Sequence, residues 1–329
     1  MLEVVQPSDF YLDSENLTWV DNAFYSQSPY WIRSVGTAEQ QCYVTKEAGE
    51  IIAYSFVGFK HFPLGIGKVA VIERGPVARD LRSLEKHIQA LAQQKRWIQV
   101  EISPYNTHLD RQAVQSVLHK NGWLARDFQR VIYLHTVIVD LLPEIDEIKR
   151  NLRRSLKTQI NKATKSDIEI RVNLHADEAI EFHNEFALHQ GIAPISEQEH
   201  RLINTAIEQK KKYCQVLTAW QDEKLIGAII LLGMGETILY QWGVSHRDEA
   251  YRKLPITHLL HWEAICLAKK LGFRRYDFGG YWMEKGDDNP INRFKTGFSK
   301  QIDALIGEYF YRTSPLRSKL YELIIKRNA

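Results

Sequence analysis

The order of secondary-structure elements expected in the first half of the sequence recurs in the second half, and this repeat limits the folds available to the chain. Between residues 42 and 104, three β-rich runs precede a helix and a strand that stops at Pro104. Between residues 214 and 280, three β-rich runs, a helix and a strand ending at Gly279-Gly280 follow in the same order. Meandering strands with a helix on one face form an α+β layer pattern. The repeat therefore predicts an α+β (mixed α/β) chain with two tandem domains, each a mixed, mostly antiparallel sheet flanked by helices.

The positions of these runs give the expected element and domain boundaries. We predict strands at residues 42–44, 51–59, 69–72, 97–103, 214–220, 224–232, 237–244 and 274–278, and helices at 81–91, 108–120, 177–190, 197–212 and 255–271. Domain 1 is expected to span residues 1–143 and domain 2 residues 144–329. A last helix begins at Ser314-Pro315, and we expect it to pack on domain 1 with Leu316, Leu320 and Ile324 on its buried side.

Composition and charge are those of a soluble globular protein. Of the 329 residues, 44% are hydrophobic and 25% charged, and the formal net charge of +3 is too small to indicate a nucleic-acid-binding protein by itself. Cys42, Cys214 and Cys266 have no metal-ligand spacing, which is typical of reduced cysteines in the cytosol. The first ten residues do not resemble a signal peptide, and the longest apolar run, Ile226–Met234, is too short to span a bilayer. We therefore expect a cytoplasmic protein with no transmembrane segment and, because its 12 histidines also lack ligand spacing, no metal site.

The stretch from Tyr276 to Phe298 has the residue types expected of a ligand site. A strand ends at Gly279-Gly280, and glycine lets the backbone approach a ligand with no Cβ in the way. A polar loop then leads to Arg293, Phe294 and Lys295. A cation on each side of an aromatic ring suits a phosphate or a carboxylate with a flat group beside it. Taken alone, the same residues also fit a strand, a glycine turn and a solvated loop.

A helix predicted over residues 144–165 carries an apolar stripe and a dense set of cations. Between residues 149 and 162 there are six cations and no acid. Such a run either keeps a helix soluble or faces a polyanion. The cations that we expect to contact a polyanion are Lys149, Arg150, Arg153, Arg154 and Lys157.

The motifs of this sequence resemble those of the FemABX family, the aminoacyltransferases that form peptidoglycan bridges. Tyr-Asp-Phe-Gly-Gly (276–280) followed by Arg-Phe-Lys-Thr-Gly-Phe (293–298) resembles the family's signature. Arg-Gly-Pro-Val (74–77), Gln-Ser-Pro-Tyr-Trp (27–31) and the basic segment at 151–157 fit the same family in the same order. The resemblance covers nearly the whole chain and implies two GNAT-like domains. Because the basic helix leads directly into a strand, with no inserted helical hairpin, the chain resembles the arm-less, FemX-like form.

The resemblance also implies an activity and its partners. Family members transfer an amino acid from aminoacyl-tRNA to an amine on a cell-wall precursor peptide, which is UDP-linked or lipid-linked. Aminoacyl-tRNA is therefore the expected co-substrate, and no cofactor is expected. Peripheral contact with the inner face of the membrane is a further expectation. A related branch of tRNA-dependent ligases builds peptide natural products with the same chemistry, and the motifs do not separate the two.

The resemblance assigns roles to individual residues. Phe294 and Lys295 are expected to contact the tRNA acceptor end and its ester, where Lys295 acts as a catalytic residue by stabilising negative charge. Asp277 is the second catalytic candidate, as acceptor of the amine proton, although an Asp at this place is at least as often a turn-former. The cation Arg33 is placed for the precursor's phosphates, and the chain departs from the family in having Ser103 rather than an acid before Pro104. The full substrate-binding set is Trp31, Arg33, Tyr251, Gly279, Gly280, Arg293 and Phe294, and the tRNA-binding set is the five cations named above.

Two other functions stay open at this point. An acyl-CoA-dependent GNAT N-acyltransferase needs bare backbone amides at a glycine-rich helix start to hold the pyrophosphate. Residues 251–258 have no glycine at that place, and Pro255 removes an amide donor, while Gly75 in domain 1 is a lone glycine. The other alternative is a non-catalytic nucleic-acid-binding module built on the basic helix, which the near-neutral total charge disfavours.

Overall fold

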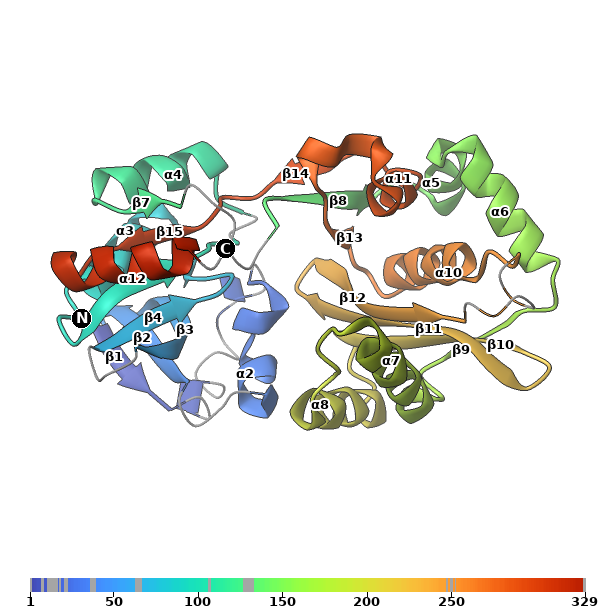
Figure 1. The fold of residues 1–329 in the computed structure, drawn as a ribbon, viewed down its shortest axis with the longest axis horizontal. Coiled ribbons are helices and arrows are strands. Elements are labelled where there is room, and N and C mark those ends of the chain that lie inside the picture. Colours follow the sequence, from blue (N-terminus) through green and yellow to red (C-terminus); the bar gives the residue numbers. More distant parts are fainter. Residues whose placement is uncertain are drawn as a thin grey trace. The chain divides into compact units, whose positions relative to one another are not determined.

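A computed structural model of the chain describes residues 2–6, 9–10, 17, 19–20, 23–35, 40–62, 67–105, 108–126, 133–246, 248, 251 and 253–327. The chain divides into two compact units, the first formed by residues 1–134 with 305–329 and the second by residues 135–304 (Figure 1). Each unit has its own mixed sheet and its own helices, so the α+β architecture predicted from the sequence is confirmed. Within the described ranges, no helix combines the length and apolar character needed to cross a membrane.

The sheet of the first unit has the strand order β1-β2-β3-β4-β6-β15-β7, with β5 paired to β3. Neighbouring strands are antiparallel except β4 and β6, which are parallel. The strands are β1 (Leu2–Val5), β2 (Gln41–Glu47), β3 (Glu50–Phe62), β4 (Gly67–Ile72), β5 (Val77–Ala78), β6 (Trp97–Ile102), β7 (Leu124–Ala125) and β15 (Tyr309–Tyr311). The helices are η2 (Tyr25–Gln27), α2 (Pro29–Val35), α3 (Leu81–Ala92), α4 (Arg111–Lys120) and α12 (Pro315–Arg327).

Helix α3 shows how the first unit forms its core. Its first turn is capped by Asp80, whose carboxylate accepts a hydrogen bond of 2.8 Å from the Ser83 amide. Its apolar stripe, Leu84, Ile88 and Leu91, is fully buried, as the helical spacing in the sequence predicts. Burying each such side chain contributes roughly 1.5–3 kcal/mol relative to leaving it exposed.

The sheet of the second unit has the strand order β14-β8-β13-β12-β11-β10-β9. Only β12 and β13 are parallel among its neighbouring pairs. The strands are β8 (His135–Asp140), β9 (Glu169–Val172), β10 (Cys214–Gln221), β11 (Lys224–Met234), β12 (Thr237–Ser245), β13 (Arg275–Gly280) and β14 (Ile302–Ala304). The helices are α5 (Ile145–Asn151), α6 (Arg154–Thr164), α7 (Ala176–Gln190), α8 (Glu197–Glu208), α10 (Ile256–Lys270), η4 (Met283–Asp288) and α11 (Pro290–Lys295).

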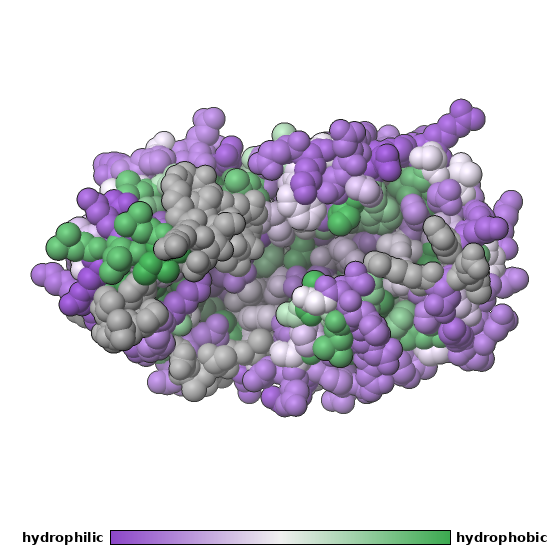
Figure 2. Space-filling view, viewed as in Figure 1, coloured by the Kyte–Doolittle hydropathy of each residue, from purple (hydrophilic) through white to green (hydrophobic). Residues whose placement is uncertain are grey.

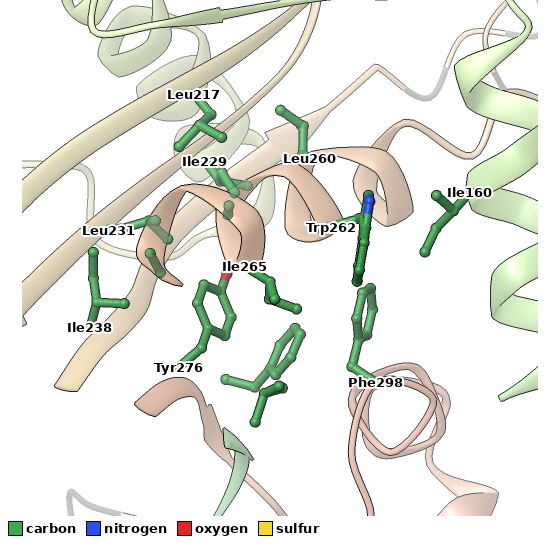
Figure 3. Packing of buried hydrophobic residues seen from close by; sticks show 14 of the residues in the cluster. Ile160, Leu217, Ile229, Leu231, Ile238, Leu260, Trp262, Ile265, Tyr276 and Phe298 are labelled. Carbon is green, nitrogen blue, oxygen red and sulfur yellow. The ribbon is translucent and has the colours of Figure 1, made fainter. Parts of the chain in front are cut away.

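The core of the second unit lies between α10 and the sheet, while α7 and α8 cover the other face (Figure 1). Leu260 and Ile265 of α10 pack with side chains of β10, β11 and β12 (Figure 3). Trp262 belongs to the same cluster, which also includes Ile160 of α6 and Phe298. The helix α10 therefore joins the sheet to the segment that carries the sequence motif.

The unit boundary differs from the predicted domain boundary between residues 143 and 144. Strand β8 belongs to the second unit because it pairs with β13, and this places the change of unit at residues 134 and 135. Residues 305–329 belong to the first unit, in which β15 pairs with β6. The sequence gives no sign of this returning strand, which is only three residues long.

The predicted helix over residues 144–165 is wrong in one respect, because it is two helices. Leu152 and Arg153 have extended backbone angles (ψ 147° and 138°) between α5 and α6. At this break the Arg153 amide donates to the Gly297 carbonyl at 2.9 Å, and its guanidinium donates to the Arg293 carbonyl at 3.1 Å. The contact with the motif segment replaces the helical hydrogen bonds, which explains a break that contains neither proline nor glycine.

The predicted burial of the last helix is also wrong. The exposed fractions of Leu316, Leu320 and Ile324 are 85%, 45% and 42%, whereas Ser318 and Tyr321 of the same helix are buried. The helix α12 is therefore turned so that polar groups and one tyrosine face the sheet of the first unit. Helical spacing alone groups residues on a face but does not say which face is covered.

Candidate active site

The end of strand β13 is shaped by the buried side chain of Asp277. β12 and β13 pair only from Thr237 with Arg275 to Leu239 with Asp277, and β13 then continues without β12. The Asp277 carboxylate accepts hydrogen bonds from the Gly279 amide at 2.7 Å and from the Thr136 hydroxyl. Gly279 has a φ of 71°, a region that favours glycine. One oxygen of Asp277 is thus already engaged in fixing the glycine turn.

Lys295 comes from α11 and reaches the same glycine turn. Its Nζ donates a hydrogen bond of 2.7 Å to the Gly280 carbonyl, and only 8% of the residue is exposed. Burial lowers the pKa of Lys295 from 10.5 to about 8, and the Asp277 charge acts in the opposite direction. An ammonium group has three N–H donors. A buried, weakly acidic ammonium of this kind is suited to donating to an oxygen that becomes negative during a reaction.

The position of Lys295 is fixed by two asparagines around α11. Asn289 caps the helix, accepting from the amides of Ile291 at 2.8 Å and Asn292 at 3.1 Å, and Pro290 occupies the first turn. The Asn292 side chain is buried and donates to the carbonyls of Trp282 and Gly286, both at 2.8 Å. The loop between β13 and α11 is therefore tied to the helix that carries Lys295.

An aromatic cluster surrounds His261 beside these groups. Its ring centroid lies 4.8 Å from Phe278, 5.4 Å from Phe294 and 5.8 Å from Phe298. Its Nδ1 is 2.7 Å from the Tyr276 hydroxyl, and its Nε2 has no hydrogen-bond partner among the residues that the structure describes. Burial, with the Lys295 charge next, lowers the pKa of His261 to about 3, so the ring is neutral. His261 is fully buried, so it is a residue of the core of the second unit.

A cavity of about 640 Å³ lies in the second unit at the start of α10. Its wall is formed by residues from the end of β12, from α6 and from the segment before α10, including Gln159, Ser245, Tyr251, Pro255, Thr257 and His258. Tyr251, expected to bind substrate, lines this cavity. The His258 ring meets Phe294 with 5.1 Å between centroids. The cavity wall therefore touches the motif segment, a connection that the sequence did not indicate.

The three motif residues 293–295 face different surroundings. Arg293 is exposed, Phe294 is half-buried against His258 and His261, and Lys295 is buried. Gly279 and Gly280 lie in the turn that Asp277 and Lys295 contact. The second unit thus brings together Asp277, Gly279, Gly280, Phe294 and Lys295.

The five predicted tRNA-binding cations differ in their exposure and in their contacts. Arg150 and Arg154 are exposed on α5 and α6. Arg153 is held by the motif segment, with a further hydrogen bond of 3.0 Å to Thr296, and Lys157 donates to the Arg150 carbonyl at 2.9 Å. Lys149 lies over the Trp262 ring at 5.6 Å. Arg150 and Arg154 are therefore the cations best exposed to a polyanion.

Trp31 and Arg33 belong to the first unit, on α2. Trp31 is half-buried and makes an edge contact with Tyr25 at 4.8 Å, while Arg33 is exposed in the last turn. Ser103, where the family resemblance led us to expect an acid, is buried and accepts a hydrogen bond of 2.8 Å from the Arg74 amide. At this position the chain has a structural hydroxyl and no carboxylate.

Comparison with known proteins finds that the chain is similar to acyltransferases. Residues 150–296 match the family model of the acetyltransferase (GNAT) domain. The chain is 26% identical to the aminoacyltransferase FemB of Staphylococcus epidermidis over 125 residues, which is 36% of this chain and 30% of FemB. It is 28% identical to the lipid II:glycine glycyltransferase of Staphylococcus haemolyticus over 130 residues, 37% of this chain and 29% of that protein. The matches thus span less than a third of these relatives.

The fold is similar to that of solved structures over nearly the whole chain. The crystal structure of FemX superposes with a TM-score of 0.77 at 14% identity, covering 98% of this chain and 99% of that one. A tandem GNAT protein from the clavulanic acid biosynthesis pathway superposes with a TM-score of 0.52 at 12% identity, covering 95% and 98%. These similarities support the predicted pair of GNAT-like domains.

Proposed function

We propose that the chain is an acyltransferase of the FemABX family and that it moves an amino acid from aminoacyl-tRNA to an amine of a peptidoglycan precursor peptide. The reaction would form part of an interpeptide bridge. The relatives support this substrate class by their names, FemB and lipid II:glycine glycyltransferase. The observation that carries the proposal is the buried Lys295, held by the Gly280 carbonyl beside the Asp277 turn.

In the proposed reaction, the acceptor amine attacks the ester carbonyl of the aminoacyl group. A carbon–nitrogen bond forms, the carbonyl oxygen becomes negative, and the bond to the ribose oxygen then breaks. The Lys295 ammonium donates a hydrogen bond to the negative oxygen, a contribution that typically changes rates by about 10²–10³. The amine gives up one proton and the ribose oxygen gains one, so the products are an amide and free tRNA.

The acceptor of the amine proton is a separate part of the proposal. Asp277 is close to Lys295, but its Oδ1 already accepts from the Gly279 amide and the Thr136 hydroxyl. These bonds favour a structural role for Asp277. We therefore propose that water or a group of the substrate takes the proton, while Asp277 holds the glycine turn in place.

The exposed cations of α5 and α6 supply a surface for the tRNA backbone in this proposal. Phosphate contacts by arginine need exposed side chains, which Arg150 and Arg154 have. No cofactor is required beyond aminoacyl-tRNA, and we place the reaction in the cytoplasm. The precursor peptide, UDP-linked or lipid-linked, is the second substrate.

An acyl-CoA-dependent N-acyltransferase is the alternative function, and the cavity at the start of α10 is the observation in its favour. Pro255 forms the N-cap of this helix and has no amide hydrogen, and no side chain caps the helix there. The pyrophosphate would therefore lack one of the bare amides that usually hold it.

A comparison of donors tests the proposal. The purified protein is incubated with precursor peptide and either charged tRNA carrying a labelled amino acid or labelled acetyl-CoA. We expect label in the peptide only with charged tRNA, and much less with Lys295→Met than with Lys270→Met, which removes an exposed lysine instead. Labelling from acetyl-CoA alone would establish the alternative.

A further inference from the structure

Helix α12 exposes its apolar side chains and buries its polar ones. Leu316, Leu320, Leu323 and Ile324 have exposed fractions of 85%, 45%, 68% and 42%. These positions follow the helical spacing i, i+4, i+7, i+8, so they form one continuous stripe. Figure 2 shows hydrophobic side chains gathered at the place that α12 occupies in Figure 1. Contiguous exposed apolar surface of this kind marks an interaction site more often than a solvated face.

Specific polar contacts hold α12 in this orientation. The Ser318 hydroxyl donates to the Gln99 side-chain oxygen, and the Gln99 amide donates to the Glu322 carboxylate at 2.7 Å. Arg126, whose side chain is only 1% exposed, donates to the same carboxylate at 3.3 Å. If the helix turned to bury its leucines, Glu322 would move away from Gln99 and Arg126. These two buried side chains would then lose a carboxylate that accepts their hydrogen bonds, which costs free energy.

An apolar contact reinforces the same orientation. Tyr321 is buried and packs with Val69 of β4 and Ile98 of β6. The inner face of α12 therefore packs against the first unit. Because both the polar and the apolar contacts of this face fix the orientation of the helix, the leucine stripe on the opposite face must point outward.

The charges of α12 are arranged around the stripe. Arg317 and Lys319 are exposed, and at about 100° per residue they lie on opposite flanks of it. The single acid of the helix, Glu322, is directed to the buried network instead. The outer face thus presents aliphatic side chains between cations.

We propose that this outer face of α12 docks on an anionic membrane surface, with the helix axis in the plane of the interface. Aliphatic side chains enter the boundary between headgroups and acyl chains, and the flanking cations meet lipid phosphates. Lysine and arginine suit this place because their stems are apolar while their charged ends reach the headgroups. The stripe is too small for a standard protein interface, which uses about 20–30 residues on each side.

The docking surface does not depend on the reaction that the protein catalyses. One consequence does rest on the proposed function, namely that the acceptor is the lipid-linked form of the precursor. A protein held at the membrane surface encounters a lipid-linked peptide by diffusion within the plane of the membrane. A UDP-linked peptide gains nothing from this placement.

The test is flotation of the full-length protein with vesicles. One set contains phosphatidylglycerol and phosphatidylcholine, and the other contains phosphatidylcholine alone. We expect binding to the anionic vesicles and much weaker binding to the neutral ones. Replacing Leu316, Leu320 and Leu323 by serine should abolish binding, and reversing Arg317 and Lys319 to Glu should weaken it by roughly tenfold or more.

The matched control is a variant with Leu174 and Leu188 changed to serine, since these leucines are 72% and 73% exposed in the second unit. It should bind like the native chain. The urea unfolding midpoint reports folding independently of any activity, and all variants should keep a midpoint close to that of the native chain. No binding of the native chain to anionic vesicles, or full binding by the triple serine variant, would overturn the proposal. So would a native dimer that the triple variant converts to a monomer in sedimentation, because the stripe would then face a second copy.

Discussion

Replacing Lys295 by methionine is expected to remove most of the activity without destabilising the fold at neutral pH. Because burial lowers the pKa of Lys295 from 10.5 to about 8, the unfolded chain binds this proton more tightly than the folded chain. A difference of this size lowers the unfolding free energy by about 3 kcal/mol at pH values below about 8. The penalty disappears as pH rises from 8 toward 10.5, so this group makes the native chain more stable with increasing pH.

Methionine removes the penalty and also the hydrogen bond from Nζ to the Gly280 carbonyl. A buried acceptor that loses its donor costs about 1–3 kcal/mol. We therefore expect Lys295→Met to be about 0–2 kcal/mol more stable than the native chain at neutral pH, and less stable than it at about pH 10. The rate of transfer should fall by about 10²–10³ because one preorganised donor is lost.

The assay is urea unfolding of the native chain, Lys295→Met and Lys270→Met at several pH values from neutral to about 10. Lys270 is exposed, so its replacement should leave the unfolding free energy, its pH dependence and the transfer rate unchanged. A stability difference between the native chain and Lys295→Met that does not vary with pH would refute the argument from a buried ammonium. Near-normal transfer by Lys295→Met would remove this residue from the mechanism.

Three further predictions concern α5, α6 and the cavity. Reversing Arg150 and Arg154 to Glu should weaken tRNA binding and reduce the slope of log K against log salt by roughly one unit per lost phosphate contact, and an unchanged slope would show that these cations are only solvated. Arg153→Ala should lower the unfolding free energy by about 1–2 kcal/mol, since Arg153 hydrogen-bonds the Arg293 carbonyl and Thr296, and an unaltered urea midpoint would contradict this role. Calorimetry with acetyl-CoA at millimolar concentration should show no saturable heat, and a micromolar dissociation constant would favour the CoA-dependent alternative.

The layers of the fold could be predicted from the sequence because alternation and helical spacing record burial locally. The stripe of α3 and the two meanders are examples, and the structure confirms both. The break at Leu152 and Arg153 could not be predicted in the same way. It depends on hydrogen bonds to residues 293 and 297, about 140 positions away in the chain.

The orientation of α12 illustrates the same limit. Its leucines have regular helical spacing, which predicted a buried stripe, but Gln99 and Arg126 hold the opposite face of the helix. Since both residues come from distant parts of the sequence, no local pattern could indicate this outcome.

For the candidate site, the motif identified Lys295 and the glycine turn. The motif did not indicate that Thr136, on strand β8, donates a hydrogen bond to Asp277. It also did not indicate the burial that lowers the pKa of Lys295. The contact between Phe294 and His258 likewise joins the motif to a helix some 36 residues earlier in the chain. Spacing along the chain cannot reveal such contacts between elements.

The most direct test of the proposed function is to mix the protein and a precursor peptide with all twenty charged tRNAs and to measure which of them loses its amino acid. We predict that one tRNA species, or a small group, is deacylated only when the acceptor peptide is present. The same amino acid should appear as an amide on the peptide by mass spectrometry, and Lys295→Met should lose both signals. Unchanged charging of every tRNA, with the peptide unmodified, would contradict the account.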